Sequence, residues 1–318
     1  MPREHRLRLV AAFAAVYLIW GSTYLAIRYA VATIPPYLMA GARFGSAGLI
    51  LLGLSRLRGA AWPTARQWGV AWISGTLLLA GGIGSVSWAE QHVPSGLAAM
   101  VAGAVPLVTV VVDWLRPGGS RPAGITIVGL LAGFAGVVLL INPGANDAAR
   151  VVPAGAGILV VAVLSWACGT VFSRHVHGAP SPLMGAGASM VMGSASLFTL
   201  ATLLGETAAF DPAAVSVHSL AALSYLVVFG SVLAFTAYFW LIKNTTPAKA
   251  MTYAYVNPVL ALLLGWAVEG EPVTPRVVVS ATVILAAVLM VTALPHARDW
   301  LVRRPGFRRP DALEGGRT

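Results

Sequence analysis

The chain has 318 residues, of which 58% are apolar and 10% charged, and its formal net charge is +10. A soluble protein of this length needs a charged, solvated surface that so few charged residues cannot supply, so the composition predicts an integral membrane protein. The single cysteine excludes an internal disulfide framework. The arginines lie in short connections and tails rather than on one face, which argues against a nucleic-acid partner.

Ten apolar stretches are each long enough to cross a lipid bilayer as a helix, which takes roughly 20 residues. They are continuous apolar runs without the alternation that is typical of barrel strands. The predicted spans are 9–28, 37–55, 68–88, 95–115, 123–142, 155–174, 183–204, 220–242, 248–267 and 276–294. The sequence therefore predicts an all-α integral membrane protein with ten transmembrane helices.

Basic residues are distributed unevenly between the two sides of this predicted bundle. With the N-terminus placed inside, seventeen Lys and Arg residues fall on that side and three fall outside. Cytoplasmic loops carry an excess of Lys and Arg, so both termini are predicted to be cytoplasmic. Arginine outnumbers lysine, and Ala and Gly are abundant, as is typical of a high-GC bacterium. The expected location is a bacterial inner membrane.

The two halves of the chain resemble each other. In the first two spans of each half, an offset of 146 residues aligns Trp20 with Trp166 and Arg28 with Arg174. In the later spans, an offset of 152 residues aligns three further pairs: Trp88 with Trp240, Pro106 with Pro258, and Trp114 with Trp266. Each half holds five spans, so the second half enters the membrane from the opposite side. Two inverted five-helix repeats are typical of secondary transporters, whose site lies at the repeat interface. The predicted divisions are a tail (1–8), repeat 1 (9–142), a linker (143–154), repeat 2 (155–294) and a basic tail (295–318).

The first span combines an aromatic residue with a polar run. Trp20 lies near its middle, too deep for the aromatic belt at a membrane surface, and so either packs in the core or lines a cavity. Ser22 and Thr23 follow it in an otherwise apolar helix, which favours a face towards a cavity. Trp166 occupies the matching place in the sixth span. All four are candidate substrate-binding residues.

The second span carries Arg43, the one charge that lies clearly inside a predicted span. It sits about six residues, or roughly 9 Å, from the outer start of that helix. A charge at that depth indicates a functional site unless the side chain snorkels to the interface. The small residues 40–42 indicate a packed helix face, which favours a place for Arg43 in a substrate cavity.

The third and eighth spans carry tryptophans near opposite sides of the membrane. Trp88 near the outer side and Trp240 near the inner side are candidate gate residues, together with Glu90. The aromatic belt is the simpler explanation of both tryptophans. Glu90 lies near an interface, as His92 and Asp113 do, and is interpreted as a boundary residue rather than a proton carrier.

Prolines occur at matching depth in the fourth and ninth spans. Pro106 and Pro258 each lie about halfway along a predicted helix, where each removes one helical hydrogen bond. A packing kink explains either proline alone, but a matched pair of interrupted helices indicates the binding region. The sequence therefore predicts that both line the substrate site.

The ninth span is also unusually polar for a membrane helix. Thr252, Tyr253, Tyr255 and Asn257 lie within six residues, and their polar groups need partners. The two tyrosines and Asn257 cannot all share one face of a regular helix, so some must contact neighbouring helices. Asn257, directly before Pro258, is the best candidate for a hydrogen bond to substrate, and Tyr253 and Tyr255 are further candidates.

Glycines recur along one face of the fifth span, at Gly129, Gly133 and Gly136. This small-residue stripe allows a second helix to approach closely. It predicts packing either within the fold or in a homodimer, and the sequence leaves both open.

Several motifs of other protein classes are absent from the sequence. It has no phosphate-binding loop for ATP and no G-x-S-x-G nucleophile, and its histidines and Cys168 form no cluster with ligand spacing. No Asp or Glu lies in the middle of a span, which gives no support for proton antiport. We therefore expect neither an enzyme nor a metal or other cofactor.

These residues include motifs of a known family. The EamA-type drug/metabolite transporter superfamily is resembled by the stretches I-W-G-S-T-Y (19–24), A-R-F (42–44), W-A-E-Q-H-V-P-S-G-L-A-A (88–99), P-L (106–107) and G-E-P (270–272). The W-A-E-Q-H-V-P-S-G stretch (88–96), together with D-W-L (113–115), is similar to the YedA-like branch of that superfamily. The resemblance covers 12–294 and implies two repeats of five helices around a central cavity, with helices 5 and 10 at the periphery. One departure is R-P-G-G at 116–119, where the first repeat of the family has a G-E pair.

Together these observations predict a transporter that exports small metabolites by alternating access. Members of the family export amino acids and related metabolites, so this resemblance favours amino acids or their derivatives. Because the embedded charge is positive, anionic or zwitterionic substrates are expected. The alternatives are an exporter of drugs, cations or nucleosides with the same fold, and a membrane scaffold or sensor without transport.

Overall fold

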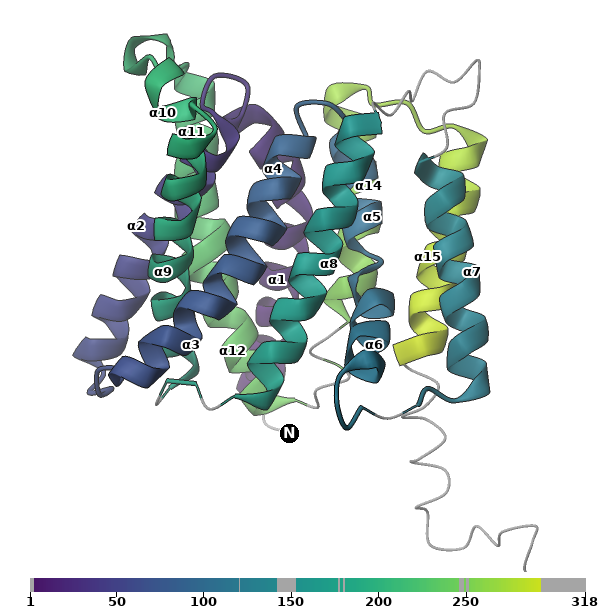
Figure 1. Cartoon of the computed structure of the whole chain (residues 1–318), viewed down its shortest axis with the longest axis horizontal. Coiled ribbons are helices and arrows are strands. Elements are labelled where there is room, and N and C mark those ends of the chain that lie inside the picture. The colour runs from purple at the N-terminus through teal and green to yellow at the C-terminus, as the bar shows by residue number, and fades with distance from the viewer. Residues whose placement is uncertain are drawn as a thin grey trace, which may run out of the picture.

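The structure is a computed structural model that describes residues 3–119, 121–141, 153–176, 178–179, 181–245, 249 and 252–292. Every regular element in these ranges is helical (Figure 1). Most of the linker predicted at 143–154 and part or all of the two predicted tails lie outside the described residues.

The helices follow one another in two series. The first half contains α1 (Arg3–Ala30), α2 (Pro36–Leu57), α3 (Ala65–Gly75), η1 (Thr76–Gly84), α4 (Ser85–Ala89), α5 (Ser95–Ala102), α6 (Val105–Leu115) and α7 (Gly124–Ile141). The second half contains α8 (Pro153–His175), α9 (Pro182–Leu203), the short α10 (Glu206–Ala209) and η2 (Pro212–Ala214), α11 (Val217–Tyr225), η3 (Leu226–Leu233), α12 (Ala234–Asn244), α14 (Tyr253–Glu269) and α15 (Pro275–Thr292).

Each of the ten predicted spans coincides with helical structure. Seven helical runs are long and apolar enough to cross a membrane: α1, α2, α3 to α4, α5 to α6, α8, α9 and α11 to α12. Three further apolar helices, α7, α14 and α15, are shorter. The first helix starts at Arg3, so residues 3–8 of the predicted tail are helical.

Local sequence explains where several helices begin. Thr64 and Gln67 form a capping box at α3, in which the Thr64 hydroxyl accepts from the Gln67 N–H and the Gln67 side chain accepts from the Thr64 N–H. Proline occupies the first turn of α2 and α9, where its missing N–H costs no helical hydrogen bond.

Glu206 of α10 caps the start of α2, where its carboxylate accepts a hydrogen bond from the Leu38 N–H at 2.9 Å. Burial raises the pKa of Glu206, and the backbone N–H groups of α2 act in the opposite direction.

The third and eighth predicted spans each contain a π-helical segment, which the sequence analysis does not predict. The η1 segment joins α3 to α4, and η3 joins α11 to α12, without interruption of the helix. Each π segment offers a main-chain oxygen to a helix beside it. The Trp20 indole N–H donates to the Gly230 carbonyl at 3.1 Å, and the Ser165 hydroxyl donates to the Leu77 carbonyl at 2.8 Å. Single-turn π-helical segments occur frequently at functional sites.

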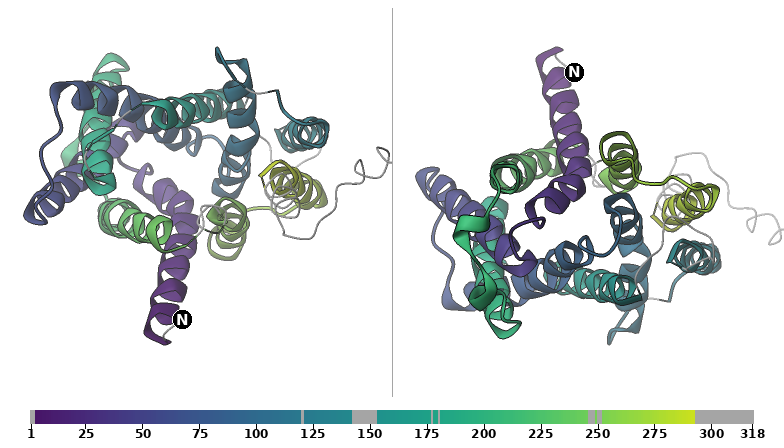
Figure 2. Two further views of the ribbon diagram at one scale, coloured as in Figure 1. Left: turned by 90° about the horizontal axis from the view of Figure 1, so that it is seen from below. Right: turned by 90° about the horizontal axis from the view of Figure 1, so that it is seen from above.

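Glycines set the closest helix contacts. On α2, a Cβ at Gly48 would lie 2.8 Å from the backbone nitrogen of Val191 and 2.9 Å from the Gly187 carbonyl of α9. The predicted stripe of Gly129, Gly133 and Gly136 on α7 faces α15, where a Cβ at Gly129 would lie 2.7 Å from Val291. Both Figures 1 and 2 show α7 and α15 side by side at one edge of the bundle. The stripe is therefore used for packing within the fold.

Matching helices of the two halves have matching neighbours. The first helix of the first half, α1, contacts the eighth span, which consists of α11, η3 and α12. Its counterpart in the second half, α8, contacts the third span, which consists of α3, η1 and α4. In the same way α1 contacts α14, and α8 contacts α5 and α6. Three further pairs join counterparts directly: α2 with α9, α5 with α14, and α7 with α15.

Candidate functional site

Arg43 is buried inside the protein, with 4% of its surface exposed. It projects from α2 towards η3, where its Nε donates to the Ser231 hydroxyl at 3.0 Å. Its guanidinium carbon lies 4.7 Å from the centre of the Phe44 ring, a distance that suits a cation–π contact. Its Nη1 has no hydrogen-bond partner. The side chain therefore does not snorkel to an interface.

Glu90 directly follows α4 and is 3% exposed. The interpretation of Glu90 as a residue near an interface stays a prediction, but its side chain is enclosed by protein. Neither carboxylate oxygen has a hydrogen-bond partner of normal geometry, although the backbone of Arg28 approaches it. The side chains of Arg28, Arg43 and Glu271 and the phenol of Tyr24 are close enough to interact with it electrostatically. Asp113, which the sequence analysis also places near an interface, lies in the last turn of α6 and pairs with Arg116 at 2.7 Å.

Asn257 is 8% exposed on α14, and its Oδ1 has no hydrogen-bond partner. It lies four residues beyond Tyr253, and residues at this spacing share a helix face. Tyr253 contacts the Trp20 ring of α1, so this face of α14 is directed towards α1. Tyr255 packs instead against the core that contains Val86 and Val101. The prediction that the two tyrosines and Asn257 do not all share one face is confirmed.

The two prolines act differently in the two halves. The fourth predicted span is divided after Ala102 into α5 and α6, and Pro106 is the second residue of α6. In the ninth span, α14 runs from Tyr253 to Glu269 and continues through Pro258 without a break. Pro106 therefore lies beside the break of the fourth span and Pro258 lies inside α14, and a substrate-lining role for the two prolines stays a prediction. Proline suits the first turn of a helix, which explains the start of α6. The two helices still meet here, because a Cβ at Gly103 would lie 2.9 Å from the Pro258 ring.

Trp20 is the centre of an aromatic cluster. Its ring centre lies 4.8 Å from that of Tyr253 and 5.2 Å from those of Phe235 and Tyr238. Together with the indole hydrogen bond to Gly230, these contacts join α1 to α14 and to the eighth span. Trp166, its counterpart, lies against η1, where a Cβ at Gly82 would be 2.8 Å from the indole ring. Both tryptophans therefore lie between helices, each beside a π-helical segment.

The hydroxyls of Ser22 and Thr23 are satisfied within the protein. Ser22 donates to the main-chain oxygens of its own helix and shares a hydrogen bond of 2.7 Å with the Tyr225 hydroxyl. Thr23 donates to the Trp20 carbonyl at 2.6 Å. These contacts account for the polar run of the first span without a substrate, and a substrate-binding role for either residue stays a prediction.

The two candidate gate tryptophans each lie beside a histidine. The Trp88 ring stacks on that of His92, with 4.2 Å between the ring centres. The Trp240 ring is tilted against that of His5 at 6.0 Å. Both are half-buried, and a gating role for them stays a prediction.

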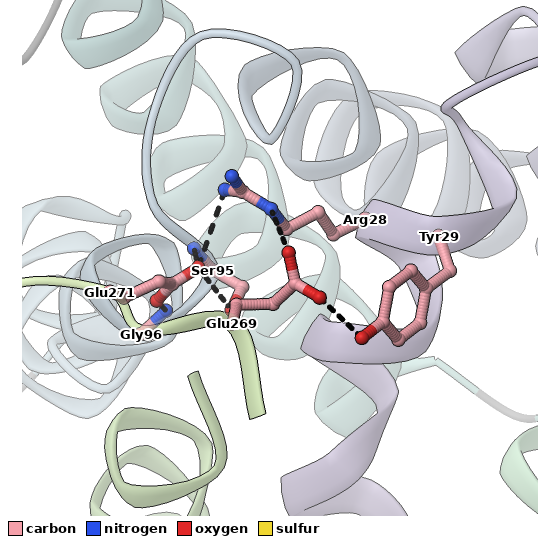
Figure 3. Close-up of polar contacts among 6 residues, drawn as sticks. All are labelled: Arg28, Tyr29, Ser95, Gly96, Glu269 and Glu271. Atoms are coloured by element: carbon pink, nitrogen blue, oxygen red, sulfur yellow. Dashed lines mark hydrogen bonds and ion pairs between the residues drawn. The ribbon is translucent and has the colours of Figure 1, made fainter. Parts of the chain in front are cut away.

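A cluster of charges that the sequence analysis does not identify joins three elements at the end of the bundle opposite the N-terminus (Figures 1 and 3). Arg28 at the end of α1 lies 3.3 Å from Glu271 and 3.8 Å from Glu269. Tyr29 donates a hydrogen bond to Glu269. The Glu271 carboxylate also accepts from the Ser95 N–H at 2.7 Å and the Gly96 N–H at 3.0 Å, at the start of α5. The G-E-P motif is the signal that could have indicated this contact.

The other half has no equivalent of this carboxylate. At the offset of 152 residues, Glu271 aligns with Gly119, in the R-P-G-G departure noted above. Arg174, the counterpart of Arg28, lies instead near Asp113, which is already paired with Arg116.

Two cavities lie elsewhere in the protein, and Arg43, Glu90 and Asn257 line neither of them. One, of about 320 Å³, is lined by Ala26, Tyr29, His218, Ala221, Ala222 and Tyr225, and a smaller one of about 140 Å³ lies between α3, α8 and α9. Within the described ranges, no group of three or more His, Cys, Asp or Glu residues could hold a metal ion. The candidate site consists of the buried side chains of Arg43, Glu90 and Asn257.

Comparison with known proteins gives consistent results. The model of the EamA-like transporter family matches this chain twice, over residues 7–142 and 153–293. The chain is 40% identical over 287 residues to the inner membrane transporter YedA of Escherichia coli (strain K12), covering 90% of this chain and 91% of that protein. It is 26% identical to the WAT1-related protein At3g02690, chloroplastic, of Arabidopsis thaliana, covering 89% of this chain and 69% of that one. A solved crystal structure with 22% identity has the same fold, with a TM-score of 0.60 over 92% of this chain and 99% of the other.

Proposed function

Because this chain belongs to the EamA-like transporter family, we propose that it exports small metabolites across a bacterial inner membrane by alternating access, with amino acids and their derivatives as the favoured class. The cargo enters a site between two inverted five-helix repeats, 9–142 and 155–294, and both termini are cytoplasmic. Relatives are named as membrane transporters, which supports the general class of activity.

Three observations support the inverted arrangement. The family model matches the chain twice, with one match in each half. Several helix contacts are repeated between counterparts, such as that of α1 with α14 and that of α8 with α6. Both third helices of the halves contain a π-helical segment at the corresponding depth. An odd number of spans in each half inverts the second relative to the first.

The single observation that carries the substrate class is the burial of Arg43. A positive charge taken out of water costs several kcal/mol unless it is paired. The Ser231 hydroxyl and the Phe44 ring pair it only in part, and Nη1 remains open. A substrate carboxylate would complete this pairing with a charge-assisted hydrogen bond. A permanent cation would add a second positive charge to the same region, so anionic or zwitterionic cargo is favoured.

The test is transport by the purified full chain in liposomes without ATP. Vesicles are loaded with a panel of labelled amino acids, nucleosides and organic cations, and efflux is compared with that of protein-free vesicles. Efflux of amino acids is expected. Efflux of cations or nucleosides alone would favour an exporter of another class, and no efflux by folded protein across the panel would favour a scaffold or sensor.

The topology has its own test. Reporter enzymes that are active on only one side of the inner membrane are fused after the last helix and in the connection between the first two. Cytoplasmic activity of the first fusion and periplasmic activity of the second are expected from the distribution of basic residues. The reverse pattern would contradict the proposed orientation.

A further inference from the structure

Gly230 and Ser231 are neighbours on η3, and together they hold the guanidinium of Arg43 along one edge. Nε of Arg43 donates to the Ser231 hydroxyl at 3.0 Å, and Ser231 is fully buried. A Cβ at Gly230 would lie 3.3 Å from Nη2 of Arg43, which is closer than most such contacts in proteins. Nη2 therefore lies against the main chain of η3, at a position where the lack of a side chain leaves room for it.

These two contacts occupy one of the two edges through which a guanidinium can bind a carboxylate. One edge consists of Nε and Nη2 and the other of Nη1 and Nη2, because the five N–H groups form a rigid planar fork. The ring of Phe44 lies over the guanidinium at 4.7 Å and covers one flat face. Nη1 has no hydrogen-bond partner among the described residues. The open position of this buried charge is thus on the side away from the Ser231 hydroxyl.

The main chain of Gly230 is itself fixed to α1. Its carbonyl accepts a hydrogen bond from the Trp20 indole N–H at 3.1 Å. A Cβ at Gly230 would also lie 3.1 Å from the methyl carbon of Thr23. Trp20 and Thr23, which the sequence analysis identifies as candidate substrate-binding residues, therefore contact the residue against which Arg43 packs. Side chains from α1 and α2 meet η3 at this one glycine.

We propose that Gly230 and Ser231 are positioning residues of the substrate site, which orient Arg43 so that Nη1 is presented to the carboxylate of the cargo. This proposal rests on the proposed function, in which Arg43 binds that carboxylate. Without the Ser231 hydroxyl, Nε becomes a second unpaired donor and no longer fixes the orientation of the guanidinium. A side chain at position 230 displaces Nη2. Either change disturbs the alignment on which a charge-assisted hydrogen bond depends.

A purely structural role of η3 leads to a different expectation. If Ser231 only satisfies a buried donor, its loss destabilises the protein and affects the binding of all ligands equally. A positioning residue instead changes the discrimination between a carboxylate and a neutral group of similar shape. The property to measure is therefore the preference for an amino acid over its carboxamide, because the two ligands differ only in the group that Arg43 is proposed to bind.

The experiment measures binding by the detergent-solubilised full chain, from the rise in melting temperature as each ligand is titrated. The twenty common amino acids are first tested on the wild type, and the one that binds most tightly is then compared with its carboxamide. The wild type is expected to prefer the acid by at least about tenfold, because hydrogen bonds to a charged acceptor are stronger than those to a neutral one.

Two variants on η3 test the positioning role independently. Ser231→Ala and Gly230→Ala are each expected to reduce the preference for the acid at least about threefold, while the affinity for the carboxamide is unchanged. Ser231→Thr keeps the hydroxyl and is expected to retain the preference. Ser224→Ala on α11 is the matched control with wild-type preference, because the exposed Ser224 hydroxyl donates to the Leu220 carbonyl of its own helix at 2.9 Å. If a Ser231 variant does not fold, Gly230→Ala provides the test.

A double-mutant cycle shows whether Ser231 acts through Arg43. Arg43→Gln removes the positive charge and is expected to lose the preference for the acid. In that background, Ser231→Ala is expected to change the preference no further. An equal loss caused by Ser231→Ala in both backgrounds would show that Ser231 acts on the ligand by another route, and would overturn the proposal.

Other results would also overturn it. These are a wild-type preference in both Ser231→Ala and Gly230→Ala, an equal loss of affinity for acid and carboxamide, or a folded Ser231→Thr without the preference. Each would give η3 a structural role and leave the proposed function standing. If the folded wild type binds none of the amino acids, or binds acid and carboxamide equally, the substrate class of the proposed function and the positioning role fail together.

Discussion

The carboxylate of Glu271 accepts a hydrogen bond of 2.7 Å from the backbone N–H of Ser95, and so the connection before α15 caps the start of α5. The same carboxylate accepts from the Ser95 hydroxyl and the Gly96 N–H and lies 3.3 Å from Arg28. A negative charge at a helix N-terminus is favoured by the helix dipole and by the free N–H groups there. One side chain thus joins α5, α1 and the α14–α15 connection.

Glu271→Ala is expected to lower the free energy of unfolding by about 1–3 kcal/mol, because it removes a buried charged acceptor from several donors. The measurement is the melting temperature of the detergent-solubilised protein. Glu269→Ala is the matched control. Glu269 is more exposed and lies 3.8 Å from Arg28, so its loss is expected to cost at most about 1 kcal/mol. Equal effects of the two variants would contradict the capping role.

Arg43→Ala is expected to reduce transport of a carboxylate-bearing substrate strongly, because it removes the buried positive charge that would pair with the carboxylate. Arg43→Lys should recover little if the contact is bidentate, since an ammonium lacks the planar fork of a guanidinium. Efflux rates from liposomes give the comparison. Equal transport of a neutral or cationic substrate by the wild type and Arg43→Ala would indicate that Arg43 has only a structural role.

Gly75→Ala is expected to destabilise the protein by about 1–3 kcal/mol, because core positions tolerate added atoms poorly. A Cβ at this position would lie 2.2 Å from the Ser189 carbonyl and 2.7 Å from the Gly193 nitrogen, both main-chain atoms of α9. Gly69→Ala on the same helix is the control, because nothing lies within 4 Å of its added carbon. The control should melt at or above the wild-type temperature, and a Gly75→Ala variant that does the same would contradict the close approach of α3 and α9.

Trp20→Phe is expected to cost about 1 kcal/mol, because it keeps an aromatic ring but loses the N–H that bonds to Gly230. Trp20→Ala also empties the ring cluster with Tyr253 and Phe235 and is expected to cost about 3–5 kcal/mol. Thermal unfolding of both variants gives the two values. A Phe variant as unstable as the Ala variant would show that the hydrogen bond, and not the ring, holds α1 in place.

The membrane fold and the burial of Arg43 could be predicted because both depend on local composition. An apolar run of sufficient length predicts a span, and small residues next to a charge indicate a packed face. The same reasoning could not find the burial of Glu90, because the charged residues that act on it, Arg28, Arg43 and Glu271, are distant in the sequence. It does account for the break of the fourth span, because Pro106 removes the helical hydrogen bond to the Ala102 carbonyl, and α5 ends at Ala102.

The π-helical segments and the Arg28–Glu271 pair were missed for related reasons. Glycine is common in η1, but no local signal distinguishes a wider helical turn from an ordinary one. Arg28 and Glu271 are far apart in the sequence and come together only when the first and last parts of the bundle pack. A motif such as G-E-P can indicate that its glutamate has a partner without identifying which residue that partner is.

The two hydrogen bonds to the π-helical segments also bear on how this chain tolerates substitution. In both, the acceptor is a main-chain oxygen, at Leu77 and at Gly230. Any amino acid at position 77 presents that oxygen, so the bond from Ser165 does not depend on which side chain stands there. The donors, Trp20 and Ser165, are the members that cannot be exchanged freely. The side chain at position 77 can therefore change without loss of this bond between η1 and α8.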